Sequence, residues 1–170
     1  WFELAESAQA PSWHEERLPA EERPWLVLFN GLDSFHVDAA TERHAAAVKL
    51  RSQLEGEVMP GYIAPQRWFA GKGQGEPTVA ITDIGRWQPK QELWLLTVVS
   101  TQFASDAAQE YFLPLALEWG AESIGAQAAH AHARVRQRAA TGLLFDAFAD
   151  DDFVRALLGA LAERSSVRIG

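Results

Sequence analysis

The sequence contains no cysteine, which excludes disulfide bonds and thiolate metal sites and favours a reducing compartment. Cations are also few, because 15 Lys and Arg stand against 23 Asp and Glu and leave a net charge of -8. No stretch concentrates them, so nucleic acid is not an expected partner. No apolar run approaches the roughly 20 residues that span a bilayer, and no signal peptide is evident. We therefore expect a cytoplasmic protein without a membrane partner.

The start of the chain predicts that it is a piece of a longer polypeptide, because it opens on Trp1 without an initiator methionine. Residues 3–24 mix charged residues with three prolines and show no helical or strand period. They are predicted to form a linker or a surface arm. The first strand is expected at 25–29, where Asn30-Gly31 predicts the turn that follows it.

A single amphipathic helix is predicted over 38–55. Asp38 is its expected N-cap and Gly56 its expected C-terminal stop. Ala47, Leu50 and Leu54 share one face of that helix. Prolines and glycine within 57–66 are then expected to break the chain.

The following segments have the composition of β-strands. Residues 78–87, 92–103 and 109–119 are rich in β-branched and aromatic residues and predict an antiparallel meander, in which Pro114 favours an edge or a bulge. The helix is available to cover one face of this sheet, so the predicted fold class is α+β with an antiparallel β-sheet packed by an amphipathic helix. Alternation over 128–138 predicts a further, half-exposed strand.

The C-terminal part is predicted to end in a second helix. Residues 142–145 suit a short apolar strand or turn, and Asp150 is the expected cap of a helix that runs to about Arg164. Its inward residues are expected to be Phe153, Leu157, Leu158 and Leu161.

The most distinctive stretch is Arg67-Trp68-Phe69-Ala70-Gly71-Lys72-Gly73, an aromatic pair beside a Gly-Lys-Gly turn. A phosphate-binding loop would need a glycine at position 66 and Ser or Thr at position 73, but Gln66 and Gly73 stand there. We therefore interpret the stretch as a structural corner, in which the aromatic rings anchor a core and the glycines make a turn.

Three other patterns could carry chemistry but have structural interpretations that we favour. His130 and His132 lie on one strand face, as zinc ligands can, but no third ligand is patterned with them and arginines continue that face. Solvated histidines are expected there. Asp38 follows His36 as in a kinase catalytic loop, but the downstream asparagine of such a loop is missing. The acidic run 150–152 could chelate magnesium, but at a helix start it more often caps the helix.

Seven tryptophans are unusual in 170 residues, and exposed indoles often bind sugars. Trp68, Trp94 and Trp119 are expected in the core, whereas Trp13 and Trp87 are expected at the surface.

Four motifs, in this order, resemble the N-terminal cap of bacterial maltokinases: Met59-Pro60-Gly61-Tyr62-Ile63, Gln66–Gly73, Tyr111-Phe112-Leu113-Pro114-Leu115 and Gly142-Leu143-Leu144-Phe145-Asp146-Ala147. The resemblance covers about Pro24 to Arg164. The first four residues are similar to the closing strand of a trehalose synthase, which implies a fusion protein. The resemblance to the maltokinase cap also implies a cystatin-like fold for this domain.

The resemblance implies a parent enzyme that uses ATP and Mg²⁺ to convert maltose to maltose 1-phosphate in α-glucan and glycogen metabolism. It divides the chain into a linker or domain tail at 1–23, the cap at 24–120 and the start of an intermediate lobe at 121–170. The expected partners are the remaining kinase lobes and a trehalose synthase domain.

The residues give no catalytic or metal-binding assignment to this chain, because catalytic-loop and metal-binding motifs are missing from it. Arg67, Trp68, Phe69, Gly71, Lys72 and Gly73 are assigned as a structural family signature, and Lys72 is kept as a candidate nucleotide contact. A non-catalytic cap is the leading hypothesis. The alternatives are an α-glucan-binding module that uses exposed tryptophans and an assembly element that joins synthase to kinase.

Overall fold

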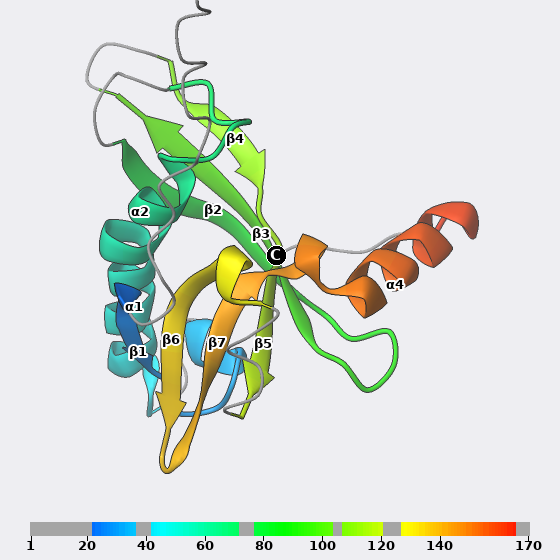
Figure 1. Cartoon of the computed structure of the whole chain (residues 1–170), viewed down its shortest axis with the longest axis horizontal. Helices are drawn as coiled ribbons and strands as arrows, with labels where there is room; N and C mark the ends of the chain where they lie inside the picture. The colour runs from blue at the N-terminus through cyan, green and yellow to red at the C-terminus, as the bar shows by residue number, and fades with distance from the viewer. Residues whose placement is uncertain (1–21, 37–41, 72–76, 104–106, 121–126, 166–170) are drawn as a thin grey trace, which may run out of the picture.

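A curled sheet and a long helix make up most of the fold (Figure 1), and a second helix projects away from them. The structure is a computed structural model that describes residues 22–36, 42–71, 77–103, 107–120 and 127–165. The strands are β1 (Trp25–Val27), β2 (Thr78–Trp87), β3 (Trp94–Gln102), β4 (Gln109–Phe112), β5 (Leu115–Trp119), β6 (Ala131–Gln137) and β7 (Ala140–Asp146). The principal helices are α1 (His44–Gln53), α2 (Met59–Ile63) and α4 (Asp151–Ala162). The predicted α+β class is confirmed.

The first long helix was predicted to stop at Gly56, but it continues to Ile63. A π-helical turn, Leu54–Val58, joins α1 to α2, and the N–H of Met59 donates to the carbonyl of Leu54. Pro60 is the second residue of α2, in its first turn, where a missing N–H costs little. Burial of Val58, Met59, Tyr62 and Ile63 favours the helix over the local breaking signals. The predicted cap, Asp38, lies outside the described residues.

The sheet has the order β1-β6-β7-β5-β3-β2, and β4 pairs with β3 beside β5. All pairs are antiparallel except β1 with β6. The predicted meander is present, but its third segment splits at Leu113-Pro114 into β4 and β5. Because Pro114 cannot donate a ladder bond, β5 leaves β3 after one residue pair and pairs with β7 instead.

A β-bulge changes the pattern predicted for β6. Ala131 pairs with Phe145 and Ala133 with Leu144, so His132 is the extra residue between them. The bulge turns His132 toward the first long helix, where the side chain is only 1% exposed. The prediction that His132 is a solvated histidine is therefore wrong, because strict alternation fails at a bulge.

Each face of the sheet carries its own core. The larger core lies under α1 and α2 and includes Leu54, Ile63, Leu95 and Leu144. The smaller lies on the opposite face and includes Trp87, Trp94, Leu143 and Phe153. Leu143 and Leu144 belong to different cores because successive strand residues point to opposite faces.

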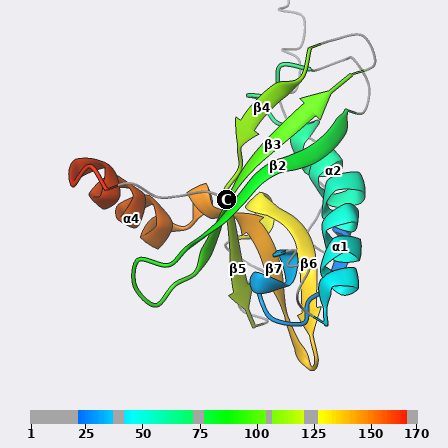
Figure 2. The same cartoon turned by 180° about the vertical axis from the view of Figure 1, so that it is seen from behind.

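The long helix also lies against both terminal strands of the sheet, β1 and β2 (Figure 2). The Gln53 amide donates to the carbonyl of Trp25 on β1, at 3.2 Å. At the other end, Arg51 donates to the carbonyl of Ile81 on β2, and Glu55 accepts from the N–H of Ile81 at 2.9 Å. Side chains from neighbouring positions of one helix thus satisfy main-chain groups on both terminal strands, which protects those edges from further strand pairing.

The sheet includes strands from both sides of residue 120. The division into a cap at 24–120 and an intermediate lobe at 121–170 stays a prediction. The predicted linker at 1–23 lies outside the described residues except for Glu22 and Arg23. Among the described residues, no helix has the length and apolar character needed to cross a bilayer.

Candidate functional site

The helix α4 is held at its N-terminal end by an aromatic socket. Phe153 packs edge-on against Trp87 and Trp94, with ring centroids 5.7 and 5.5 Å away. Asp150 joins strand to helix, because one carboxylate oxygen accepts from Trp94 Nε1 at 2.9 Å and the other accepts from the N–H groups of Asp152 and Phe153. The predicted cap at Asp150 is confirmed. The prediction that Trp87 is exposed is wrong, because the indole forms one wall of this socket.

Beyond the socket, α4 presents an apolar flank to solvent. Phe153 is fully buried, but Leu158 is 61% and Leu161 is 66% exposed. The prediction that these two leucines face inward is therefore wrong. The hydrophobic period was correct, but no part of the described sheet reaches this flank (Figure 1).

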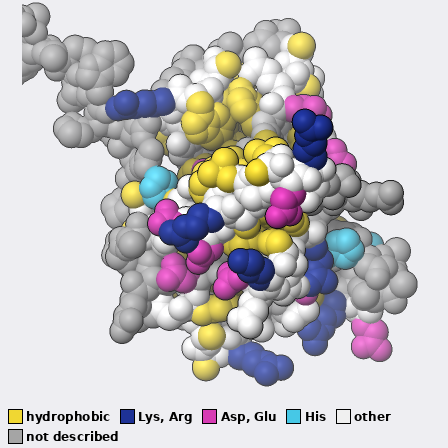
Figure 3. Space-filling view, turned by 90° about the vertical axis from the view of Figure 1, so that its right-hand side faces the viewer, with side chains coloured by type: hydrophobic (Ala, Val, Ile, Leu, Met, Phe, Trp, Pro, Cys, Tyr) yellow, Lys and Arg dark blue, Asp and Glu magenta, His cyan; other side chains and the backbone are white. Residues whose placement is uncertain are grey.

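Two exposed phenylalanines lie near the base of α4. Phe148 is 48% exposed and packs against Phe153, with a centroid distance of 5.5 Å. Phe112, at the end of β4, lies 6.1 Å from Phe148. Figure 3 shows hydrophobic side chains gathered in the middle of the face from which α4 projects, with charged groups around them. We call Phe112, Phe148, Leu158 and Leu161 the apolar patch. Such a patch is typical of a surface that docks on another structure.

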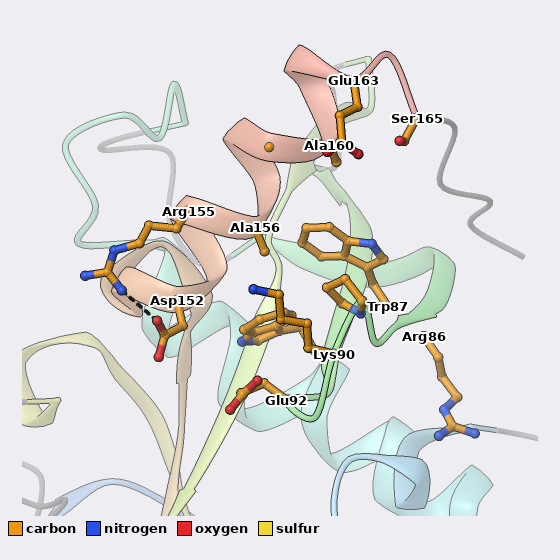
Figure 4. Close-up of a pocket in the computed structure, with 13 residues that line it drawn as sticks. Arg86, Trp87, Lys90, Glu92, Asp152, Arg155, Ala156, Ala160, Glu163 and Ser165 are labelled. Atoms are coloured by element: carbon orange, nitrogen blue, oxygen red, sulfur yellow. Dashed lines mark hydrogen bonds and ion pairs between the residues drawn. The ribbon is translucent and has the colours of Figure 1, made fainter.

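A groove of about 850 Å³ runs along the other flank of α4, between that helix and the hairpin that joins β2 to β3 (Figure 4). Its lining mixes Lys90 and Glu92 from the hairpin with Asp152 and Glu163 from the helix. Arg155 pairs with Asp152 at 2.6 Å, within the helix. The alternating charges and small residues of this groove point to no particular ligand.

The stretch around the predicted corner packs as expected at its apolar centre. Phe69 is buried, and its ring lies 5.9 Å from Tyr111 and 6.0 Å from Phe103. Gly71 is needed because a Cβ there would lie 2.3 Å from a ring carbon of Phe103. Trp68 was expected in the core but is 44% exposed, with one side against Tyr111 at 5.2 Å. Arg67 is exposed, and Lys72 and Gly73 lie outside the described residues.

Exposed indoles are also found at the ends of other elements. Trp25 on β1 is 41% exposed, with the guanidinium of Arg134 4.1 Å from its ring centre. Trp119, expected in the core, is 39% exposed at the end of β5. Trp94 is buried, as expected, and Trp13 lies outside the described residues.

His132 stacks on Tyr62 at a centroid distance of 3.7 Å, and neither imidazole nitrogen has a hydrogen-bond partner among the described residues. Tyr62 in turn donates to Asp146 at 3.0 Å. Burial lowers the pKa of His132 from 6.5 to about 3, with Arg23 and then His130 adding to the effect. No group of three His, Asp or Glu side chains among the described residues could hold a metal ion. The sequence held no signal for this buried histidine, because the bulge that buries it depends on pairing with β7.

A comparison with protein families shows what the chain is similar to. A family model described as the maltokinase N-terminal cap domain matches residues 62–150, slightly more than half of the chain. The matched range contains Phe69 and Gly71 of the corner, the Pro114 break and the Asp150 cap. No curated protein and no solved structure matches.

Proposed function

The chain belongs to the maltokinase N-terminal cap domain family, and from that premise we propose that it is a non-catalytic cap that docks on the kinase lobes and limits access to their nucleotide site. The observation that carries this proposal is the apolar flank of α4. One flank of α4 packs on the smaller core, but Leu158 and Leu161 on the other flank are more than half exposed, so this flank is suited to burial against another structure.

The described residues do not fit a complex of ATP and Mg²⁺. Asp150 already caps α4, and Asp151 and Asp152 pair with Arg155 on the exposed helix surface. We therefore assign ATP and magnesium to the lobes outside this chain, and assign it no catalytic residue. Lys72 is kept as a candidate nucleotide contact. The chain by itself is expected to form no maltose 1-phosphate from ATP and maltose, and formation of that product would contradict the proposal.

Charged substitutions in the apolar patch test the docking. Leu158→Asp with Leu161→Asp is expected to leave the stability of the 170-residue chain within about 0.5 kcal/mol, because both side chains are mainly exposed. In a longer maltokinase polypeptide that carries this cap, the same pair should lower the melting temperature and change the KM for ATP.

Gly159→Asp is the matched control, because it adds a charge to an exposed position on the groove flank of the same helix, where a side chain meets nothing within 4 Å. It should leave both measurements unchanged. If the double variant of the longer protein melts and turns over like the unmodified one, the cap does not dock through α4.

A second candidate is an α-glucan-binding module, favoured by the exposure of Trp25, Trp68 and Trp119. The cap proposal predicts little change in tryptophan fluorescence when maltose or a longer glucan is added. A saturable change that is lost in Trp68→Ala would favour the module instead. We further propose, from the resemblance alone, a cytoplasmic parent protein fused to a trehalose synthase. The assembly role stays an alternative, which a strictly monomeric parent would remove.

A further inference from the structure

The strand β4 has one main-chain edge that no described residue covers. Leu113 donates to the carbonyl of Thr97, so the ladder bonds between β4 and β3 involve the odd-numbered residues of β4. The N–H and C=O groups of Glu110 and Phe112 therefore point away from β3. The terminal strands β1 and β2 have such outward groups bound by Gln53, Arg51 and Glu55, but no hydrogen bond among the described residues reaches those of β4.

No described strand lies along the outer edge of β4, because β7 ends just before it. β7 pairs with β5 along its length, and its last pair joins Asp146 to Leu115. The chain then bends, with the N–H of Ala147 donating to the carbonyl of Pro114, and continues into α4. A strand placed beside β4 would therefore extend the line of β7 through the sheet (Figure 1).

The side chains at this edge have a definite chemistry. Glu110 and Phe112 share one sheet face, since they are two residues apart on a strand. Phe112 is 40% exposed and packs against Phe148, another residue of the apolar patch. Glu110 is exposed and makes no ion pair among the described residues. An incoming strand would thus meet an aromatic surface and, two residues away, an unpaired carboxylate.

We propose that β4 accepts an extended segment of the kinase lobes as an added strand, with an apolar residue opposite Phe112 and a Lys or Arg opposite Glu110. Such strand addition uses the outward N–H and C=O groups for affinity and the alternating side chains for specificity. The inference rests on the proposed docking function and assigns it a partner of stated chemistry.

A second copy of the chain fits this edge poorly. In the antiparallel registers that would bring Glu110 and Phe112 against a second copy of this edge, Glu110 faces another Glu110, a Phe112 or a Pro114. The first register places like charges opposite each other, and the other two leave the carboxylate without a cation. The net charge of -8 also opposes self-association.

Amide hydrogen exchange tests the inference. Exchange at Glu110 and Phe112 is compared between the 170-residue chain and a longer maltokinase polypeptide that carries it. Added hydrogen bonds should slow both amides in the longer protein by about tenfold or more. Glu110→Pro should remove the slowing at Phe112, because proline removes an outward N–H but none of the bonds to β3. The matched control is Val27→Pro, an exposed position on the β1 edge, which should leave the slowing intact.

The outcomes separate this inference from the proposed function. If α4 gains protection in the longer protein while Glu110 and Phe112 exchange at the same rate in both, docking stands and strand addition is wrong. If neither region changes, both are wrong. Slowing that appears in the 170-residue chain and grows with its concentration would identify a second copy as the occupant and overturn the assignment of the partner.

Discussion

The buried imidazole of His132 should make the stability of the chain depend on pH. The pKa of the folded-state group is lowered to about 3, chiefly by burial, whereas its ordinary value is 6.5. Between these two values the unfolded chain binds a proton that the folded chain excludes. The contribution is therefore fully present above pH 6.5 and is lost as the pH falls toward 3.

The expected size of this loss follows from the two pKa values. Lowering the pH from 8 to 5 should reduce the free energy of unfolding by about 2 kcal/mol through His132 alone. Carboxyl groups and the other histidines also respond to pH, so the wild type is compared with His132→Phe. Phenylalanine keeps a ring against Tyr62 and cannot bind a proton. It also removes two buried nitrogens that have no hydrogen-bond partner in the described part of the chain.

The assay is urea denaturation of both proteins at pH 8, 7, 6 and 5. The stability of His132→Phe relative to wild type should increase by about 2 kcal/mol from pH 8 to pH 5, whatever the offset at pH 8. Tyr62→Phe is a useful control, since it preserves the stack and His132 and should keep the wild-type pH dependence. Parallel pH profiles for wild type and His132→Phe would refute the reasoning, because they would show that His132 is solvated or bound to a partner.

Three further substitutions test the packing and capping described above. Gly71→Ala should lower the stability measured in thermal melts by about 1–3 kcal/mol, because its Cβ would overlap the Phe103 ring. Gly61→Ala should not destabilise the protein, because the space around Gly61 is open. Equal melting temperatures of the two variants would contradict the close approach of Gly71 to Phe103. Asp150→Ala should lower the free energy of unfolding measured in urea by about 1–2 kcal/mol, since it removes the helix cap and the acceptor of Trp94. Asp151→Ala should lower it by less than about 0.5 kcal/mol. A larger loss in Asp151→Ala than in Asp150→Ala would argue against the cap. Glu55→Ala should leave the N–H of Ile81 without its acceptor and so increase aggregation, measured as light scattering on heating. Glu57→Ala should not increase it. Unchanged scattering in both variants would show that Glu55 does not protect the β2 edge from aggregation.

Local patterns predicted the elements well where each depends on its own residues. β2 has the predicted bounds, and the β-branched and aromatic residues of β3 predicted a strand there. Asp150 also acts as predicted, because capping is a contact between a side chain and the next turn of the same chain. The predicted end of the first long helix was wrong, because that end depends on contacts with residues far away in sequence. Gly56 and Pro60 are breaking residues locally, but the core buries the residues around them.

The exposed aromatic and apolar residues could not be placed from sequence. Trp87 and Trp119 both lie at strand ends, yet one is enclosed by Phe153 and the other is open to solvent. The same holds for α4, whose period predicts an apolar flank but not what covers it. A hydrophobic pattern records that a residue is suited to burial, and only the arrangement of elements decides which surfaces meet.

By itself, the sequence determined the α+β class, the positions of most strands, the cap of α4 and the membership of the maltokinase N-terminal cap family. These depend on interactions between near neighbours in the chain or on residues that can be recognised directly. Only the tertiary structure decided that β1 joins β6 in parallel, that His132 is enclosed at a bulge and that no described strand pairs with the outer edge of β4. Each of these depends on hydrogen bonds between segments far apart in sequence, and no local pattern specifies which distant strand will provide them.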